Sequence, residues 1–123
     1  MTESRTAQIL YYMAKFSDGL DKTFSALADP TRRAIVSRLC DGPASVGELS
    51  KPFDIALPTL LKHVRVLEKS GLVSSEKVGR VRTCRIETSA LRASDDWLRQ
   101  HISLWEKRLD RLEDHIKRMK GEH

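Results

Sequence analysis

The chain has 123 residues, of which 40% are hydrophobic, and a formal net charge of +5 at pH 7. This length allows one domain with a modest core and is too short for two independent domains. No apolar run approaches the roughly 18 residues of a membrane span, and the N-terminus lacks the order of a signal peptide. We therefore expect no membrane partner and a cytoplasmic location.

The excess positive charge lies in one part of the chain. Residues 56–85 contain seven cations against two acids, and the other 93 residues are neutral in sum. The seven cations are Lys62, Arg65, Lys69, Lys77, Arg80, Arg82 and Arg85. Charge that is concentrated on one segment is typical of a surface that contacts a polyanion.

Residues 1–18 are interpreted as an N-terminal arm. Asp18 and Gly19 separate its apolar stretch "ILYYMAKF" from the segment that follows. Three aromatic side chains of the arm are candidates to extend a subunit interface, namely Tyr11, Tyr12 and Phe16.

Two helices are expected after the arm. Apolar residues recur at helical spacing in Leu20, Phe24 and Leu27, which predicts the first helix. Asp29 is a suitable N-cap for the second, and Pro30 fits its first position, where the missing N–H is not needed. A Gly-Pro pair ends this helix.

Two further short helices joined by a turn are predicted next. Ser45 and Glu48 form a capping box at the start of "SVGELSKPF", and Pro52 ends that helix. The segment "LPTLLKHVRVLEKSG" then carries an apolar stripe at helical spacing, and Gly71 can supply a left-handed cap. The stripe consists of Leu60, Val64 and Leu67. The pair has the form of a helix-turn-helix.

Residues 72–87, "LVSSEKVGRVRTCRIE", change to a period of two. This pattern predicts a β-hairpin with a tight turn near Val78 and Gly79 and a cationic tip. Arg82, Cys84 and Ile86 would share one face of the second strand.

The last stretch is predicted to be a long helix with one apolar stripe. Seven large apolar residues alternate steps of four and three, as in a coiled-coil seam. They are Leu98, Ile102, Trp105, Leu109, Leu112, Ile116 and Met119. We expect this stripe to form a dimer interface, because one short helix of the same chain is too short to cover it.

In this order, the predicted elements form a winged helix-turn-helix, a mainly helical fold with a small β-hairpin. At "FSALADPTRRAIVSRL", "VGELSKPFD" and "LPTLLKHVRVLEKSGLV" the sequence resembles the ArsR-type winged-helix transcriptional repressors. The hairpin and tail resemble a subgroup that lacks the familiar metal sites. The resemblance covers roughly residues 20–118 and implies a sequence-specific transcriptional regulator, a homodimer that binds double-stranded DNA at a near-palindromic operator.

The expected organisation is an arm at 1–18, a winged helix-turn-helix domain at 19–90 and a C-terminal dimerisation helix at 91–120. The predicted helix within residues 55–73 carries the candidate DNA contacts Thr59, Lys62, His63 and Arg65. The wing carries the candidates Lys77, Arg80 and Arg82. A solvated helix face and an ordinary charged hairpin are the alternatives for these two groups.

The chain departs from the family pattern at Ala56 and Leu61, where serines are common. Ala56 removes a probable side-chain cap, which costs about 1 kcal/mol. Leu61 cannot bond a phosphate, although it could touch a thymine methyl. Affinity or operator choice is therefore expected to differ from the family's usual pattern.

No metal site and no cofactor are expected. The positions that match the family's metal ligands hold Ser50, Pro52, Trp97, Leu98 and Arg118. His101 and His115 are interpreted as surface histidines. No phosphate-binding glycine loop, HExxH or GxSxG motif is present, so we expect no enzymatic activity.

Two alternatives remain open at this point. Cys40 and Cys84 form no CxxC pair and are interpreted as reduced, buried thiols, but a thiol-based redox-sensing repressor is compatible with them. A protein-interaction module that uses the C-terminal heptad helix is the second alternative. The sequence assigns no small-molecule inducer.

Overall fold

The computed structural model of the chain describes residues 5–10 and 18–121. The chain divides into two compact units, Met1–Leu91 and Arg92–His123. Residues 5–10 are helical. The predicted contributions of Tyr11, Tyr12 and Phe16 lie outside the described residues, as does part of the predicted arm.

The first two labelled helices are α2, Asp18–Leu27, and α3, Pro30–Leu39. Helical spacing was recognised in the sequence from Leu20 onwards, whereas α2 starts two residues earlier and includes Asp18 and Gly19. The N-cap prediction for α3 is confirmed, since the Asp29 carboxylate accepts a hydrogen bond from the backbone N–H of Arg32 at 3.0 Å.

The helix-turn-helix consists of α4, Val46–Ser50, and α5, Leu57–Lys69. Ser45 caps α4 by accepting the backbone N–H of Glu48 at 3.1 Å. Ala56 precedes α5 without any side-chain cap, as expected. Gly71 follows α5 with a φ of +80°, a left-handed conformation that a side chain would strain. The structure thus confirms the predicted cap at Ser45 and the left-handed Gly71, while α4 ends at Ser50, before Pro52.

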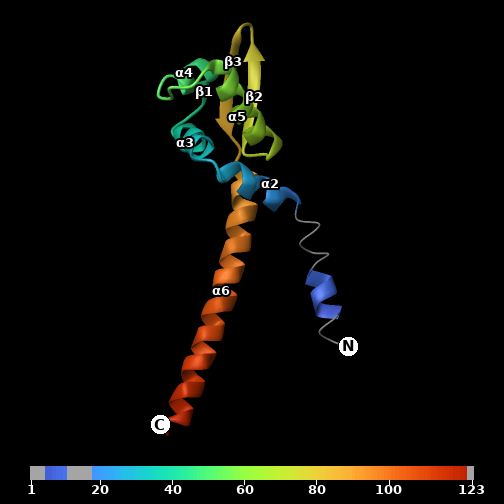
Figure 1. Cartoon of the computed structure of the whole chain (residues 1–123), viewed down its shortest axis with the longest axis vertical. Helices are drawn as coiled ribbons and strands as arrows, with labels where there is room; N and C mark the ends of the chain where they lie inside the picture. The colour runs from blue at the N-terminus through green and yellow to red at the C-terminus, as the bar shows by residue number, and fades with distance from the viewer. Residues whose placement is uncertain (1–4, 11–17, 122–123) are drawn as a thin grey trace. The chain divides into compact units, whose positions relative to one another are not determined.

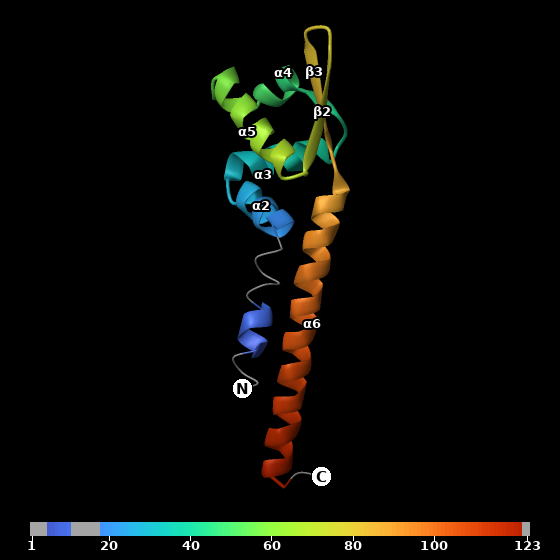
Figure 2. The same cartoon turned by 90° about the vertical axis from the view of Figure 1, so that its right-hand side faces the viewer.

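The wing is an antiparallel hairpin of β2, Val73–Val78, and β3, Val81–Ile86. Its tip projects beyond the helices of the same unit (Figures 1 and 2). A third strand, β1, Ala44–Ser45, was not predicted; it pairs with β3, so that the sheet order is β1-β3-β2. With only two residues, β1 is too short to show a period of two.

The core of the first unit lies where α3, α4, α5 and the sheet meet. Helix α5 buries its predicted stripe, Leu60, Val64 and Leu67, at 1% exposure or less. Cys84 of β3 is fully buried, whereas Val81 on the opposite strand face is exposed. Helix α5 therefore packs on the core through one face and leaves its opposite face exposed.

Helix α6, Thr88–Met119, forms nearly all of the described part of the second unit and starts three residues before the predicted 91. Every member of the predicted apolar stripe is exposed in this chain. Among the helices of residues 5–10 and 18–121, none combines the length and the apolar character that crossing a bilayer requires.

Candidate nucleic-acid interface

Helix α5 has one buried face and one cationic face. Lys62, Arg65 and Lys69 are exposed on the side away from the buried stripe. Within the described residues, none of the three forms an ion pair or a side-chain hydrogen bond. Three unpaired cations on one helix face leave the charge available to an external anion.

The start of α5 is also open to solvent. Thr59 is exposed in the first turn, so its hydroxyl is accessible, and its backbone N–H bonds the carbonyl of Ala56 at 3.0 Å. The structure thus places Thr59 at the helix end that carries the positive end of the backbone dipole. A phosphate is a suitable ligand for such a position.

A groove of about 420 Å³ separates the helix-turn-helix from the wing. Its helical side includes Gly47 of α4 and Leu57 and Leu61 of α5, and its wing side includes Lys77 and Arg80. Leu61, which stands where the family commonly has a serine, thus gives the groove an apolar wall. The groove was not predicted from the sequence, because its two sides come from α4 and α5 and from the wing, and local patterns do not show how these segments pack.

The wing cations are not equivalent. Lys77 and Arg80 are exposed near the turn at Gly79. Arg82 is half-buried and donates from Nη1 to the Ser75 hydroxyl at 2.8 Å, while Ser75 donates to Glu68 of α5 at 2.6 Å. Arg82 therefore links the wing to α5, and it is less free to contact an external ligand than the other two.

His63 lies on α5 but turns towards α3. Its Nδ1 is 3.4 Å from Nη1 of Arg32 and 3.9 Å from Oδ2 of Asp29, and its side chain is only 20% exposed. Arg32 also donates to the backbone carbonyls of Ala26 and Ser25 at the end of α2. His63 thus connects α5 to the α2–α3 corner, a role that the spacing on α5 alone did not reveal.

The charges at this corner stabilise each other. The pKa of Asp29 is held below its ordinary value, chiefly by the hydrogen bond from the backbone N–H of Arg32 and further by the charges of Arg32 and His63. Asp29 is therefore ionised at neutral pH, where it both caps α3 and faces His63.

The two cysteines differ in environment. Cys84 is buried, and burial is the main reason that the pKa of its thiol is raised, with Glu68 as the second cause. Cys40 is exposed, so the prediction that both thiols are buried was wrong for Cys40, which caps the solvent-facing end of α3. Across residues 5–10 and 18–121, no group of three His, Cys, Asp or Glu side chains is placed to hold a metal ion.

The predicted apolar stripe of α6 is the largest set of exposed apolar side chains in the second unit. Trp105 is 59% exposed and Ile102 is 54% exposed. His101 stacks on Trp97 with ring centroids 4.0 Å apart. Aliphatic and aromatic side chains in this number are unusual on a helix surface that stays in water.

Comparison with known proteins adds independent evidence. A helix-turn-helix domain family matches residues 27–76. The HTH-type transcriptional regulator Rv2034 of Mycobacterium tuberculosis is 40% identical over 73 residues, which are 59% of this chain and 68% of the relative. The transcriptional repressor SdpR of Bacillus subtilis is 27% identical over 84 residues, which are 68% of this chain and 93% of the relative.

Among solved structures, the crystal structure of an ArsR family transcriptional regulator superposes with a TM-score of 0.71. It is 52% identical, and the match covers 73% of this chain and 93% of that chain. The fold, the exposed cationic α5 and these relatives together define a winged helix-turn-helix regulator. The chain belongs to the ArsR-type winged helix-turn-helix transcriptional regulators, as its sequence motifs indicated.

Proposed function

We propose that this regulator is a repressor that binds a near-palindromic operator as a homodimer and reads it with α5. The observation that carries the proposal is the separation of faces on α5, where the buried stripe packs inward and Lys62, Arg65 and Lys69 face solvent without an ion pair to any residue that the structure describes. A helix with one packed face and one cationic face can enter a major groove without unfolding any part of the domain.

The side chains of this surface take different roles. In this proposal Lys62 and Arg65, both exposed, contact base edges or phosphates, and the exposed Thr59 donates to a phosphate at the start of α5. Lys77 and Arg80 border the groove beside α5 and contact the DNA backbone or the minor groove. His63 and Arg82 act mainly by holding α5 to its neighbours.

The homodimer rests on the apolar stripe of α6. A second copy of the same stripe provides a surface of matching period and length about a two-fold axis. A two-fold dimer presents two copies of α5 to one face of DNA, and half-sites about one DNA turn apart follow from that symmetry. The protein then acts where the operator is, in the cytoplasm of a bacterial cell, without an enzymatic step.

Sequencing of the genomic fragments that the purified chain retains tests this function. We expect the retained fragments to share an inverted repeat with half-sites about one helical turn apart. Fragments without a shared motif would contradict operator binding. A shared motif without an inverted repeat would contradict the dimer but not the reading by α5.

A further inference from the structure

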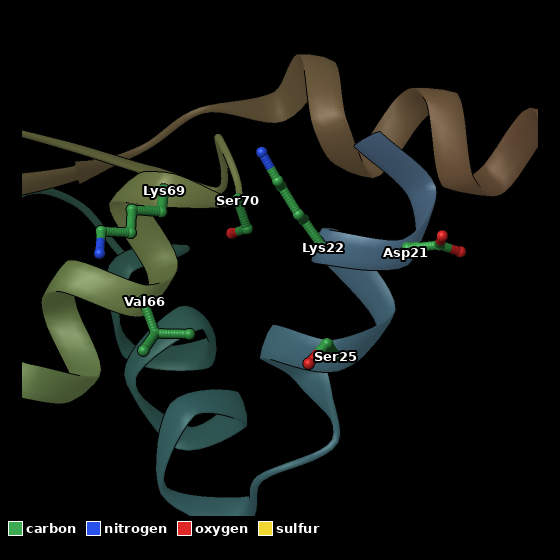
Figure 3. A pocket seen from close by; sticks show the side chains of 6 residues that line it. All are labelled: Asp21, Lys22, Ser25, Val66, Lys69 and Ser70. Carbon is green, nitrogen blue, oxygen red and sulfur yellow. The ribbon is translucent and has the colours of Figure 1, made fainter. Parts of the chain in front are cut away.

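A pocket of about 510 Å³ opens between α2 and the end of α5, within the first unit. Its volume is in the range of small-molecule sites. The lining residues are Asp21, Lys22 and Ser25 from α2 with Val66, Lys69 and Ser70 from α5 and its cap. Figure 3 shows Val66 and Ser25 facing the space between the two helices.

The charged groups of this pocket favour an anion. Lys22 extends from α2 across the space towards Ser70, whereas the carboxylate of Asp21 points away from it (Figure 3). Within the described part of the chain, Lys22 forms no ion pair. Lys69 forms none there either, but its ammonium group points away from the space in Figure 3. An unpaired ammonium group beside a concave surface is a natural partner for a carboxylate or sulfonate.

The remaining groups favour an apolar body on that anion. Val66 is 38% exposed, although it lies on the side of α5 that faces α2. Ser70 already donates its hydroxyl proton to the carbonyl of Leu67 at 2.8 Å, so it can only accept from a ligand. The hydroxyl of Ser25 makes no hydrogen bond within residues 5–10 and 18–121 and can still donate.

We propose that this pocket binds a small organic anion with an apolar body, held by Lys22 and Ser25 and packed on Val66. The ligand class is an aromatic or aliphatic carboxylate or sulfonate. The charge of such an anion interacts favourably with the ammonium group of Lys22, and its apolar body covers the exposed side chain of Val66. Both interactions favour binding.

The pocket is also placed to couple this ligand to DNA, a step that rests on the proposed operator binding. Val66 and Lys69 belong to α5, and Ser25 accepts a hydrogen bond through its carbonyl from Arg32, which contacts His63 of α5. A bound anion therefore lowers the positive potential of α5 and weakens its attraction to phosphates. By linkage, DNA weakens the binding of the anion by the same factor.

Binding is tested with the full chain and two matched probes. The anionic probe is 8-anilinonaphthalene-1-sulfonate, and N-phenyl-1-naphthylamine has the same apolar body without the charge. We expect the anionic probe to shift the backbone amide resonances of residues 21–25 and 66–70. Shifts confined to the apolar stripe of α6 would overturn the site.

Substitution separates charge from packing. Lys22→Gln should weaken the anionic probe about fivefold, the order expected for one exposed ion pair, and leave the neutral probe within about twofold. Lys51→Gln, which removes an exposed lysine outside the pocket, is the control and should change neither affinity. Equal losses of both probes in Lys22→Gln, or equal effects of the two substitutions, would contradict an anion site.

The coupling is tested separately by gel shift at saturating anionic probe. Operator affinity of the wild type should fall about threefold to tenfold, within the usual range of coupling between sites, and the fall should be smaller in Lys22→Gln. Unchanged affinity would overturn the coupling. A wild type that binds no operator without probe would contradict the proposed function instead and leave the probe result standing.

Discussion

Nη1 of Arg32, on α3, lies 3.4 Å from Nδ1 of His63, on α5. A guanidinium group has only donors, so Nδ1 of His63 is the acceptor wherever this contact is a hydrogen bond. The carboxylate of Asp29 is 3.9 Å from the same Nδ1.

This corner makes the stability of the domain depend on pH through Asp29. The folded pKa of Asp29 is lowered, chiefly by the backbone N–H of Arg32. Stabilisation from a lowered carboxyl pKa is fully present above the unfolded value of about 3.9 and is lost as pH falls through the folded value. Asp29→Asn keeps a capping oxygen but removes the charge. Urea unfolding should show a lower free energy of unfolding for the variant near neutral pH and convergence with the wild type in acid.

Asp54→Asn is the control, because Asp54 is exposed and forms no hydrogen bond or ion pair within the described residues. Its free energy of unfolding should follow that of the wild type at each pH. A difference between Asp29→Asn and wild type that is constant from acid to neutral pH would indicate lost capping geometry rather than lost charge.

The cationic face of α5 should carry operator binding. Lys62→Ala and Arg65→Ala should each cost on the order of 1–3 kcal/mol of binding free energy if the side chains read bases. If they contact phosphates, each substitution removes one contact from each protomer of the dimer and should reduce the magnitude of the log-log salt slope by about 1.8, or about 0.9 per contact. A gel-shift titration over several salt concentrations measures both quantities.

Lys51→Ala is a matched control, since Lys51 is an exposed lysine that follows α4 and lies outside the face of α5. It should leave the affinity and the salt slope nearly unchanged. Wild-type affinity in the double variant Lys62→Ala, Arg65→Ala would exclude α5 as the reading helix.

The two thiols should differ in reactivity. The thiolate is the reactive form, and burial raises the pKa of Cys84, so alkylation at mildly alkaline pH should modify the exposed Cys40 first. Mass spectrometry of partly alkylated protein measures the order. Mild oxidation with diamide should leave operator affinity unchanged; a loss that Cys40→Ser prevents would support the thiol-sensing alternative.

Operator binding should not depend on zinc, nickel, arsenite or cadmium. The positions that match the family's ligands hold side chains that are poor ligands, including Trp97 and Arg118, and the described residues contain no cluster of three metal-binding side chains. Affinities measured with a chelator and with each metal should agree within error. A reproducible tenfold release by one metal would reveal a site of different composition.

The local signals in the sequence predicted most of the fold. Asp29, Ser45 and Gly71 mark helix ends because capping depends on a few adjacent backbone groups, and the structure confirms all three. Periodicity likewise identified the buried stripe of α5. The exposed positions of Lys62 and Arg65 follow from the same helical period.

Features that depend on distant residues were not predictable in this way. His63 and Arg32 are 31 residues apart, so nothing in the spacing of α5 shows that the imidazole turns away from the cationic face. Strand β1 exists because its two residues pair with β3, and two residues carry no periodic signal. The pocket between α2 and α5 depends on how these helices pack, which neither helix specifies alone.

The exposed stripe of α6 also suggested the alternative that the protein is a protein-interaction module. A stripe that bound only a different partner would give the winged domain no need for three cations on α5 that pair with none of the described residues. The membership of this chain in a family of transcriptional regulators favours operator binding. The oligomeric state of the wild type in solution shows whether a second copy of the chain covers the stripe.

We expect the wild type to be a dimer through α6. Seven large side chains, each between 43% and 74% exposed, follow one stripe of the helix, and burial of each would contribute about 1.5–3 kcal/mol. Trp105→Ala with Leu109→Asp removes the largest apolar surface and places a charge in the stripe. Light scattering at micromolar concentration should show a wild-type dimer and a monomeric variant.

The same variant tests the link between dimer and operator. Its α5 is untouched, but a monomer loses the gain in affinity that two linked half-site contacts provide, a factor of about 10² or more. Arg111→Asp, a charge change on α6 outside the stripe, is the control and should remain dimeric with near wild-type operator affinity. A monomeric wild type would contradict both the proposed dimer and the proposed palindromic operator. A monomeric variant with full operator affinity would show that one copy of α5 is sufficient for operator binding.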